Sequence, residues 1–243
     1  VIEEFLEGEE ASFIVMVDGE HVLAMATSQD HKRVGDGDTG PNTGGMGAYS
    51  PAPVVTADVH QRILDEVIYP TVRGMAAEGH PYKGFLYAGL MIDPSGAPKV
   101  IEFNCRFGDP ETQPILMRLK SDLVALCQAA LERRLDQVEC EWDSRAAVGV
   151  VLAAEGYPGT PKKGGEIELG GAEENGAKVF HAGTKLNGDD VVTAGGRVLC
   201  ATALGNTVTE AQQRAYELAK KISWNGMFYR NDIAYRAIAR EQS

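Results

Sequence analysis

The chain has 243 residues, 44% of them hydrophobic, so it is long enough to bury one large core or two smaller ones. It carries 35 acidic and 23 basic residues, and this excess of acid excludes the basic surface with which nucleic-acid-binding proteins hold phosphates. No apolar run reaches the ~20 residues of a membrane span, and the four cysteines are too widely spaced for a zinc site or a disulfide framework. We therefore expect a cytoplasmic protein without nucleic-acid or membrane partners.

The first predicted elements are extended. The chain opens at Val1 inside a predicted strand and without an initiating methionine, so we expect it to be a piece of a longer protein. From Ala11 to Ala26, two β-branched and apolar runs flank Asp18-Gly19, a dipeptide that favours a tight hairpin turn. The following stretch, Asp30 to Pro53, is rich in glycine and proline, and we expect it to be an irregular loop. A long loop of this kind in a compact domain is often a lid.

A helix and a second hairpin follow the loop. Thr56 to Glu78 has apolar residues at helical spacing, and Pro70 is expected to kink or divide this helix. The runs Phe85 to Ile92 and Lys99 to Phe107 flank a Pro-Ser-Gly turn, which predicts a hairpin.

The last third of the chain predicts a separate module. Ser121 is expected to cap a helix that runs to about Leu135, with Leu123, Leu126, Ala130 and Leu131 inward. A boundary is expected near Trp142 to Arg145, followed by short strands and a helix opened by a capping box at Thr209 and Gln212. The predicted class is α+β, with residues 1–140 forming an antiparallel sheet with helices and residues 146–243 a small α+β domain.

The most informative residues for chemistry lie on the predicted strand before Phe107. Side chains alternate along a strand, so Glu102, Asn104 and Arg106 share one face. Carboxylate and amide oxygens suit Mg²⁺, and an arginine can neutralise a phosphoryl group bound to that metal. The alternative is a solvated strand face with a Glu-Arg pair, which is common.

Three further segments each allow two interpretations, one functional and one structural. The turn Gly108 to Thr112 either orients a substrate amine or begins a helix. The segment Asp30 to Gly47 combines basic residues with glycines that let backbone amides approach an anion, or it is a surface loop. Glu3 to Glu10 either holds an adenine edge and a ribose diol, which carboxylates bind well, or is a solvated acidic strand end.

The order of these motifs resembles the glycinamide ribonucleotide synthetase family of ATP-grasp ligases. The resemblance is carried by Ile2 to Glu10, Gln29 to Arg33, Gly40 to Pro51 and Ile101 to Gln113, and it continues through His181 to Thr184 and Gly195 to Val198. It implies a partial ATP-grasp fold and an ATP-dependent carbon-nitrogen ligase of purine biosynthesis. The implied reaction joins glycine to 5-phosphoribosylamine through glycyl phosphate, with ATP and Mg²⁺ or Mn²⁺ as cofactors.

The resemblance also implies residue roles. Glu102 and Asn104 are expected to bind the metal, and Arg106, Lys32 and Arg33 to act on the transferring phosphate. The residues expected to hold ATP are Glu3, Glu4, Phe5, Leu6 and Glu10. Those expected to bind substrate are Asp30, Asp109 and Glu111.

Two departures from the family pattern qualify these roles. The upstream glycine loop and a nucleotide-binding lysine are absent, so we expect this chain alone to have little or no ligase activity. The predicted strand Phe85 to Ile92 carries no acid, so Glu102 would have to bridge both ions of a two-metal site. The alternatives are another ATP-grasp carboxylate-amine ligase and a non-catalytic binding module. We expect a monomer.

Overall fold

The computed structural model describes residues 2, 4–170 and 175–242, and the chain divides into two compact units that are both discontinuous in sequence. The first unit contains residues 1–29, 51–108 and 119–143, and the second contains 30–50, 109–118 and 144–243. The sequence predicts domains at residues 1–140 and 146–243, and this division remains a prediction. The compact units differ from it by placing residues 30–50 and 109–118 with the carboxyl-terminal part.

The first unit is built on a four-stranded antiparallel sheet of order β2-β1-β7-β8. Its strands are β1 (Glu9–Asp18), β2 (Val22–Ala24), β7 (Lys83–Ile92) and β8 (Pro98–Asn104). Both predicted hairpins are therefore confirmed, because each turn fixes a local pairing that needs no distant partner.

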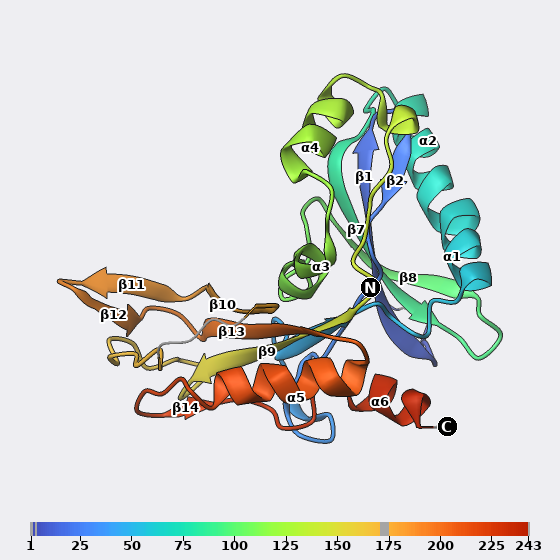
Figure 1. Ribbon diagram of the computed structural model, residues 1–243. Helices are drawn as coiled ribbons and strands as arrows, with labels where there is room; N and C mark the ends of the chain where they lie inside the picture. Colours follow the sequence, from blue (N-terminus) through green and yellow to red (C-terminus); the bar gives the residue numbers. More distant parts are fainter. Residues whose placement is uncertain (1, 3, 171–174, 243) are drawn as a thin grey trace. The chain divides into compact units, whose positions relative to one another are not determined.

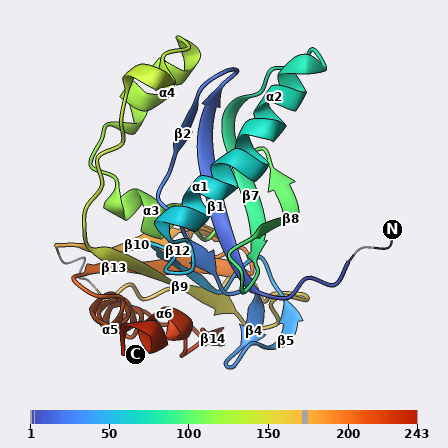
Figure 2. The same ribbon diagram turned by 90° about the vertical axis from the view of Figure 1, so that its right-hand side faces the viewer.

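Helices cover the sheet of the first unit. The broken helix consists of α1 (Ala57–Ile63), a π-helical segment η1 (Leu64–Ile68) and α2 (Tyr69–Ala77), and its buried aliphatic side chains pack with those of β1 and β7. The interruption predicted from Pro70 is confirmed, and it falls just before the proline, which lies in the first turn of α2. Figures 1 and 2 show α4 (Leu123–Leu131) on the other side of the sheet. A short 3-10 segment, η2 (Leu135–Gln137), follows it.

The cap predicted for α4 is wrong, and its predicted inward face is confirmed at Leu126 and Ala130 but wrong at Leu131. Asp122, not Ser121, caps α4 by accepting the amide hydrogens of Val124 and Ala125. Leu131 is 74% exposed. The adjacent serine instead accepts from the amide of Glu141, because neighbouring short polar side chains compete for the same kind of role.

The second unit contains a larger antiparallel sheet of order β10-β13-β9-β6-β3, with β14 (Met227–Phe228) also paired to β9. Its strands are β3 (Gln29–Asp30, of which Gln29 is counted with the first unit), β6 (Gly47–Ser50), β9 (Ala146–Ala154), β10 (Ala177–His181) and β13 (Arg197–Gly205). Alternate side chains of β9 pack against α5 (Val208–Ala219), and Gly149, between them, lies near Pro114 of α3 (Thr112–Arg118). The two helices thus cover opposite faces of this sheet, as Figure 1 shows.

The expectation that Asp30 to Pro53 is irregular is wrong. This segment contains β3, the ribbon β4 (Arg33–Gly35) and β5 (Thr39–Asn42), and β6, which is buried and pairs with β9 about a hundred residues later in the sequence. A Cβ at Gly47 would lie 2.7 Å from the Gly149 carbonyl oxygen, so the glycine permits a close backbone approach that a polar-apolar pattern does not reveal.

The remaining elements complete the second unit. The predicted stretch Val179 to Lys185 forms parts of two strands, β10 and β11 (Thr184–Asn187), and the latter forms a ribbon with β12 (Asp190–Thr193). The chain ends with α6 (Tyr235–Glu241). The box predicted at Thr209 and Gln212 is wrong: Thr207 caps α5 by accepting the amide of Glu210, and the Glu210 carboxylate accepts the amide of Asn206. The predicted α+β class is confirmed, and no helix among the described residues is long and apolar enough to cross a membrane.

Candidate functional site

Glu102 and Asn104 project from the same face of β8, as strand alternation predicts. The Asn104 side-chain amide donates to a Glu102 carboxylate oxygen at 3.1 Å. Glu102 pairs with Gly89 of β7, and a Cβ at that glycine would lie 3.2 Å from Glu102 Cγ. The glycine therefore leaves room for the glutamate side chain on this face.

Arg106 does not continue the row. β8 ends at Asn104, and the Arg106 guanidinium donates to the Phe107 carbonyl at 3.0 Å. The prediction that Arg106 shares a strand face with Glu102 is therefore wrong, because the alternation ends with the strand. The opposite face of the strand is partly open, since Phe103 is 41% exposed.

The chemistry of Glu102 and Asn104 fits a divalent cation. Their side chains already converge, and a half-turn of the amide would replace the donating nitrogen by its carbonyl oxygen beside the carboxylate. No group of three or more His, Cys, Asp or Glu side chains able to hold a metal is found among the described residues. Such a two-ligand site suits Mg²⁺, which retains waters and takes further oxygens from substrate phosphates.

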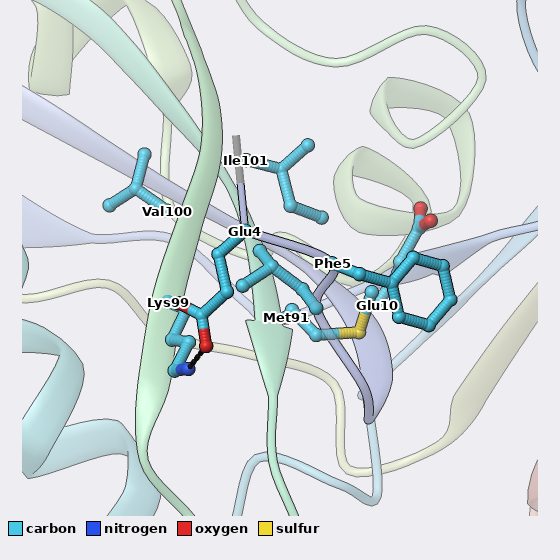
Figure 3. Close-up of a pocket in the computed structure, with 8 residues that line it drawn as sticks. Glu4, Phe5, Glu10, Met91, Lys99, Val100 and Ile101 are labelled. Carbon is cyan, nitrogen blue, oxygen red and sulfur yellow. Dashed lines mark hydrogen bonds and ion pairs between the residues drawn. The ribbon is translucent and has the colours of Figure 1, made fainter. Parts of the chain in front are cut away.

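A cavity of about 740 Å³ opens beside the first half of β8 (Figure 3). The predicted nucleotide residues Glu4, Phe5, Leu6 and Glu10 all line it, and Glu3 lies outside the described residues. The remaining lining residues, which the sequence did not identify, are Met91, Lys99, Val100 and Ile101. The β7–β8 register could have identified them, because it pairs Met91 with both Glu10 and Lys99.

One charged pair marks the edge of this cavity. The Lys99 ammonium lies 2.7 Å from a Glu4 carboxylate oxygen (Figure 3), and this hydrogen bond raises the pKa of Lys99. The cavity thus combines a cation, two carboxylates and aliphatic side chains, a mixture that suits a ligand with an apolar planar part and hydroxyl groups.

The other predicted site residues belong to the second unit. Asp30 and Lys32 are half-buried, and Arg33 is exposed and donates to the Gly40 carbonyl at 2.7 Å. Lys32 also accepts, at its carbonyl, hydrogen bonds from both the amide and the hydroxyl of Thr43.

The backbone amides of the glycine segment 43–46 all donate within the protein. Their acceptors are the Lys32 carbonyl, the Tyr157 hydroxyl, the Thr43 hydroxyl and the His31 carbonyl, in that order. The predicted approach of these amides to an anion is therefore not available in this arrangement, because each amide is already satisfied.

Asp109 and Glu111 lie just before the start of α3. One Asp109 carboxylate oxygen lies 2.9 Å from an Arg197 nitrogen. Glu111 is 2% exposed, and its carbonyl accepts the amide of Ile115. The acidic turn therefore both begins the helix and presents a carboxylate, so the two readings of this segment are compatible.

A buried charge cluster of the second unit was not predicted. The Arg230 guanidinium is 1% exposed and forms ion pairs with Asp38 at 2.9 Å and Asp232 at 2.8 Å. Burial alone would lower the pKa of Arg230, but the hydrogen bonds that it donates to the two carboxylates raise it. Conversely, the neighbouring His31, Tyr235 and Arg230 hold the pKa of Asp38 well below its ordinary value.

His31 joins this cluster to the backbone. Its Nε2 accepts the amide hydrogen of Ala234 at 2.9 Å, which places the proton of the neutral ring on Nδ1, 3.9 Å from an Asp38 oxygen. Burial first, and then the charges of Arg230 and Arg236, lower the pKa of His31. The ring is therefore neutral at pH 7. Its hydrogen bond holds the segment that contains His31 and Lys32 against the backbone at Ala234.

Comparisons with known proteins cover most of the chain. Residues 1–112 match the family model described as phosphoribosylglycinamide synthetase, ATP-grasp (A) domain, and residues 147–236 match its C domain. The chain is 77% identical to phosphoribosylamine–glycine ligase of Vibrio cholerae and 75% identical to that of Pseudomonas aeruginosa, in each case over the whole chain and 57% of the relative. The chain therefore spans little more than half the length of these relatives.

Solved structures agree with this result. The structure of phosphoribosylamine–glycine ligase from Thermotoga maritima superposes with a TM-score of 0.87 at 41% identity, over 96% of this chain and 57% of the other. The biotin carboxylase domain of a thermophilic 2-oxoglutarate carboxylase gives a TM-score of 0.65 at 17% identity, over 92% of this chain and 49% of the other, a likeness of fold alone. The predicted ATP-grasp fold is thereby confirmed.

Proposed function

Because the chain belongs to the phosphoribosylglycinamide synthetase family, we propose that the complete protein containing it joins glycine to 5-phosphoribosylamine at the expense of ATP. ATP and divalent-metal use are properties of ATP-grasp ligases, and the proposal assigns both to the first unit. The choice between Mg²⁺ and Mn²⁺, the monomeric state and the cytoplasmic location stay predictions.

The observation that carries the proposal is the continuity of the cavity with the Glu102–Asn104 pair along one strand. Ile101 lines the cavity, and Asn104 lies three residues further along β8, about 10 Å at the rise of an extended strand. In the proposed complex, Met91, Val100 and Ile101 contact the adenine, and Glu10 accepts from the ribose hydroxyls. The phosphates then extend along β8 toward Glu102 and Asn104.

The reaction proposed at this site has two steps. A carboxylate oxygen of glycine attacks the γ-phosphorus of ATP, the bond to the β-phosphate oxygen breaks, and glycyl phosphate and ADP result. The amine of phosphoribosylamine then attacks the glycyl carbonyl carbon, phosphate leaves, and the nitrogen releases a proton. A cation held by Glu102 and Asn104 supplies charge neutralisation for the phosphates.

The protein groups have positioning and electrostatic roles in this scheme. Arg106 is assigned to the transferring phosphoryl group, with Lys32 and Arg33 as further cations, and no protein nucleophile is required. Asp30, Asp109 and Glu111 are assigned to glycine and the amine substrate. A carboxylate such as that of Asp109 suits a substrate ammonium or amine because it only accepts hydrogen bonds.

The test is Glu102→Gln in the complete protein, which keeps the side-chain shape and removes the charge. We expect glycine-dependent ADP formation to fall on the order of 100-fold, with a higher Mg²⁺ requirement, because one preorganised electrostatic group is lost. Glu132→Gln, at an exposed glutamate of the same unit, is the matched control. Unchanged activity and Mg²⁺ dependence in Glu102→Gln would refute the metal assignment. Stimulation by another carboxylic acid instead of glycine would indicate a different ATP-grasp ligase.

A further inference from the structure

Arg197 connects three segments of the second unit that are far apart in the sequence. The arginine opens β13, directly after Gly195 and Gly196. One of its terminal nitrogens donates to the carbonyl oxygens of Gly44 and, at 3.0 Å, Asp109. The other donates to the Asp109 carboxylate at 2.9 Å. A single side chain thus holds both the backbone and the carboxylate of Asp109 while it holds the glycine segment.

The backbone around this arginine leaves no room for other side chains. A Cβ at Gly44 would lie 3.0 Å from Arg197 Cζ, and a Cβ at Gly45 would lie 2.3 Å from Pro110 Cδ. Gly45 also has φ +112°, which disfavours any residue with a side chain. The glycine segment and the turn at Asp109 are therefore packed directly on each other.

Tyr157, in the connection between β9 and β10, also binds the glycine segment. Its hydroxyl accepts the amide hydrogen of Gly44 at 2.8 Å. Its ring lies so close to Gly196 that a Cβ there would be 2.3 Å from Tyr157 Cδ2. The backbone of Gly44 is thus bound at both polar groups, its amide by a tyrosine and its carbonyl by Arg197.

The energetics favour a positioning role over a stabilising one. The Asp109 side chain is 54% exposed and that of Arg197 is 21% exposed, so the ion pair is screened by water and contributes little to folding. What the planar guanidinium supplies is geometry, because its fixed fork of donors can bind two carbonyls and a carboxylate at once. A lysine in its place, with one flexible nitrogen, cannot reproduce that set.

We propose that Arg197 is a positioning residue for the acceptor side of the ligase, acting through Asp109 rather than on the nucleotide. It fixes one oxygen of the Asp109 carboxylate and the backbone that precedes α3, so that the exposed Asp109 carboxylate is presented in a preformed position to an amine or amino acid. This inference rests on the proposed function, because it assigns the turn to the acceptor substrates.

The experiment compares Arg197→Met and Arg197→Lys with Arg214→Met in the complete protein. Arg214 is the matched control, because it belongs to the same unit and also binds two backbone carbonyls, those of Leu204 and Asn175. We expect Arg197→Met to raise the KM for glycine or phosphoribosylamine tenfold or more. The KM for ATP should stay near the wild-type value, because the residues assigned to the adenine, the ribose and the metal belong to the first unit. Arg197→Lys should recover part of the loss, and Arg214→Met should leave all three KM values unchanged.

Asp109→Asn closes a double-mutant cycle. If Arg197 acts through Asp109, the double variant should be little worse than the poorer single variant. Additive losses, an unchanged acceptor KM, or an equal rise in the ATP KM would overturn the inference. If Arg197→Met does not fold, the same comparison is made with Arg197→Lys, which keeps the charge. Absence of glycine-dependent ADP formation in the wild-type complete protein would instead count against the proposed function.

Discussion

Arg230→Met should destabilise the second unit more than any single loss of a surface charge. The Arg230 guanidinium is buried, donates twice to the Asp232 carboxylate at 2.8 Å and once to Asp38 at 2.9 Å, and also binds the Arg33 carbonyl at 3.1 Å. Removing one partner of a buried ion pair leaves the other charge uncompensated and costs about 3–5 kcal/mol. Since the side chains of Asp232 and Asp38 are 24% and 26% exposed, water will solvate part of the loss, and we expect the lower end, about 3 kcal/mol.

The two tryptophans make this measurement specific to one unit, since Trp142 lies in the first unit and Trp224 in the second. In a Trp142→Phe background, urea unfolding followed by fluorescence reports the environment of Trp224, which is 9% exposed. Arg230→Met should lower the midpoint strongly. Lys162→Met should not, although Lys162 lies 2.7 Å from Glu155, because that pair is exposed in the same unit. Equal midpoints for Arg230→Met and the parent would refute the reasoning.

Arg230→Met should also change how the stability of the second unit depends on pH in acid. Ion pairing with Arg230 contributes to the lowered pKa of Asp232, so this contribution to stability is present above the ordinary value of 3.8 and is lost as the pH falls through the folded pKa. Without the arginine, the pKa of Asp232 should move upward, and the stability that the parent loses below pH 4 should be smaller in the variant. A side-chain carboxyl titration by NMR measures this directly.

Further substitutions separate other physical effects. Burial lowers the pKa of His31 below 6.5, so the stability that neutral His31 contributes is present above pH 6.5 and is lost as the pH falls below it. His31→Gln, whose amide oxygen can accept from Ala234, should therefore show a smaller difference in melting temperature between pH 7.5 and pH 5.5 than the parent. Equal differences in the variant and the parent would contradict this. Gly45→Ala should destabilise by about 1–3 kcal/mol, because φ is +112° and the new methyl would lie against Pro110. Gly74→Ala, in open space within α2, should instead stabilise by about 0.5–1 kcal/mol, and the two thermal melts should shift in opposite directions.

The parts of the fold that sequence could predict are those decided by local chemistry. The hairpin at Asp18-Gly19 was predictable because the turn residues lie between the two strands that they join. β6 was not, because its four residues are held by β9, which is about a hundred residues later in the sequence. The caps at Asp122 and Thr207 were missed by one and two residues, since nearby Ser, Thr and Asp side chains can all accept amide hydrogens.

In the candidate site, too, the sequence predicted what local chemistry decides and missed what distant residues decide. Alternation along a strand predicted the common face of Glu102 and Asn104, and the hydrogen bond between them confirms it. The prediction failed for Arg106, because nothing in its local sequence indicates that β8 ends at Asn104. Arg197 and Arg230 could not be assigned from sequence, because all of their partners described above except Asp232 lie 88 to 197 residues away.

The boundary between the two units divides the most informative motif of the chain. Ile101 to Gly108 belongs to the first unit, and Asp109 to Gln113 belongs to the second. Glu102 and Asn104 are therefore oriented by the sheet that also lines the cavity, whereas Asp109 is oriented by Arg197. Residues that are close in sequence are thus positioned by different parts of the structure. Substitutions at Glu102 should change nucleotide and metal parameters together, while substitutions at Asp109 should change acceptor parameters and depend on which residue occupies position 197.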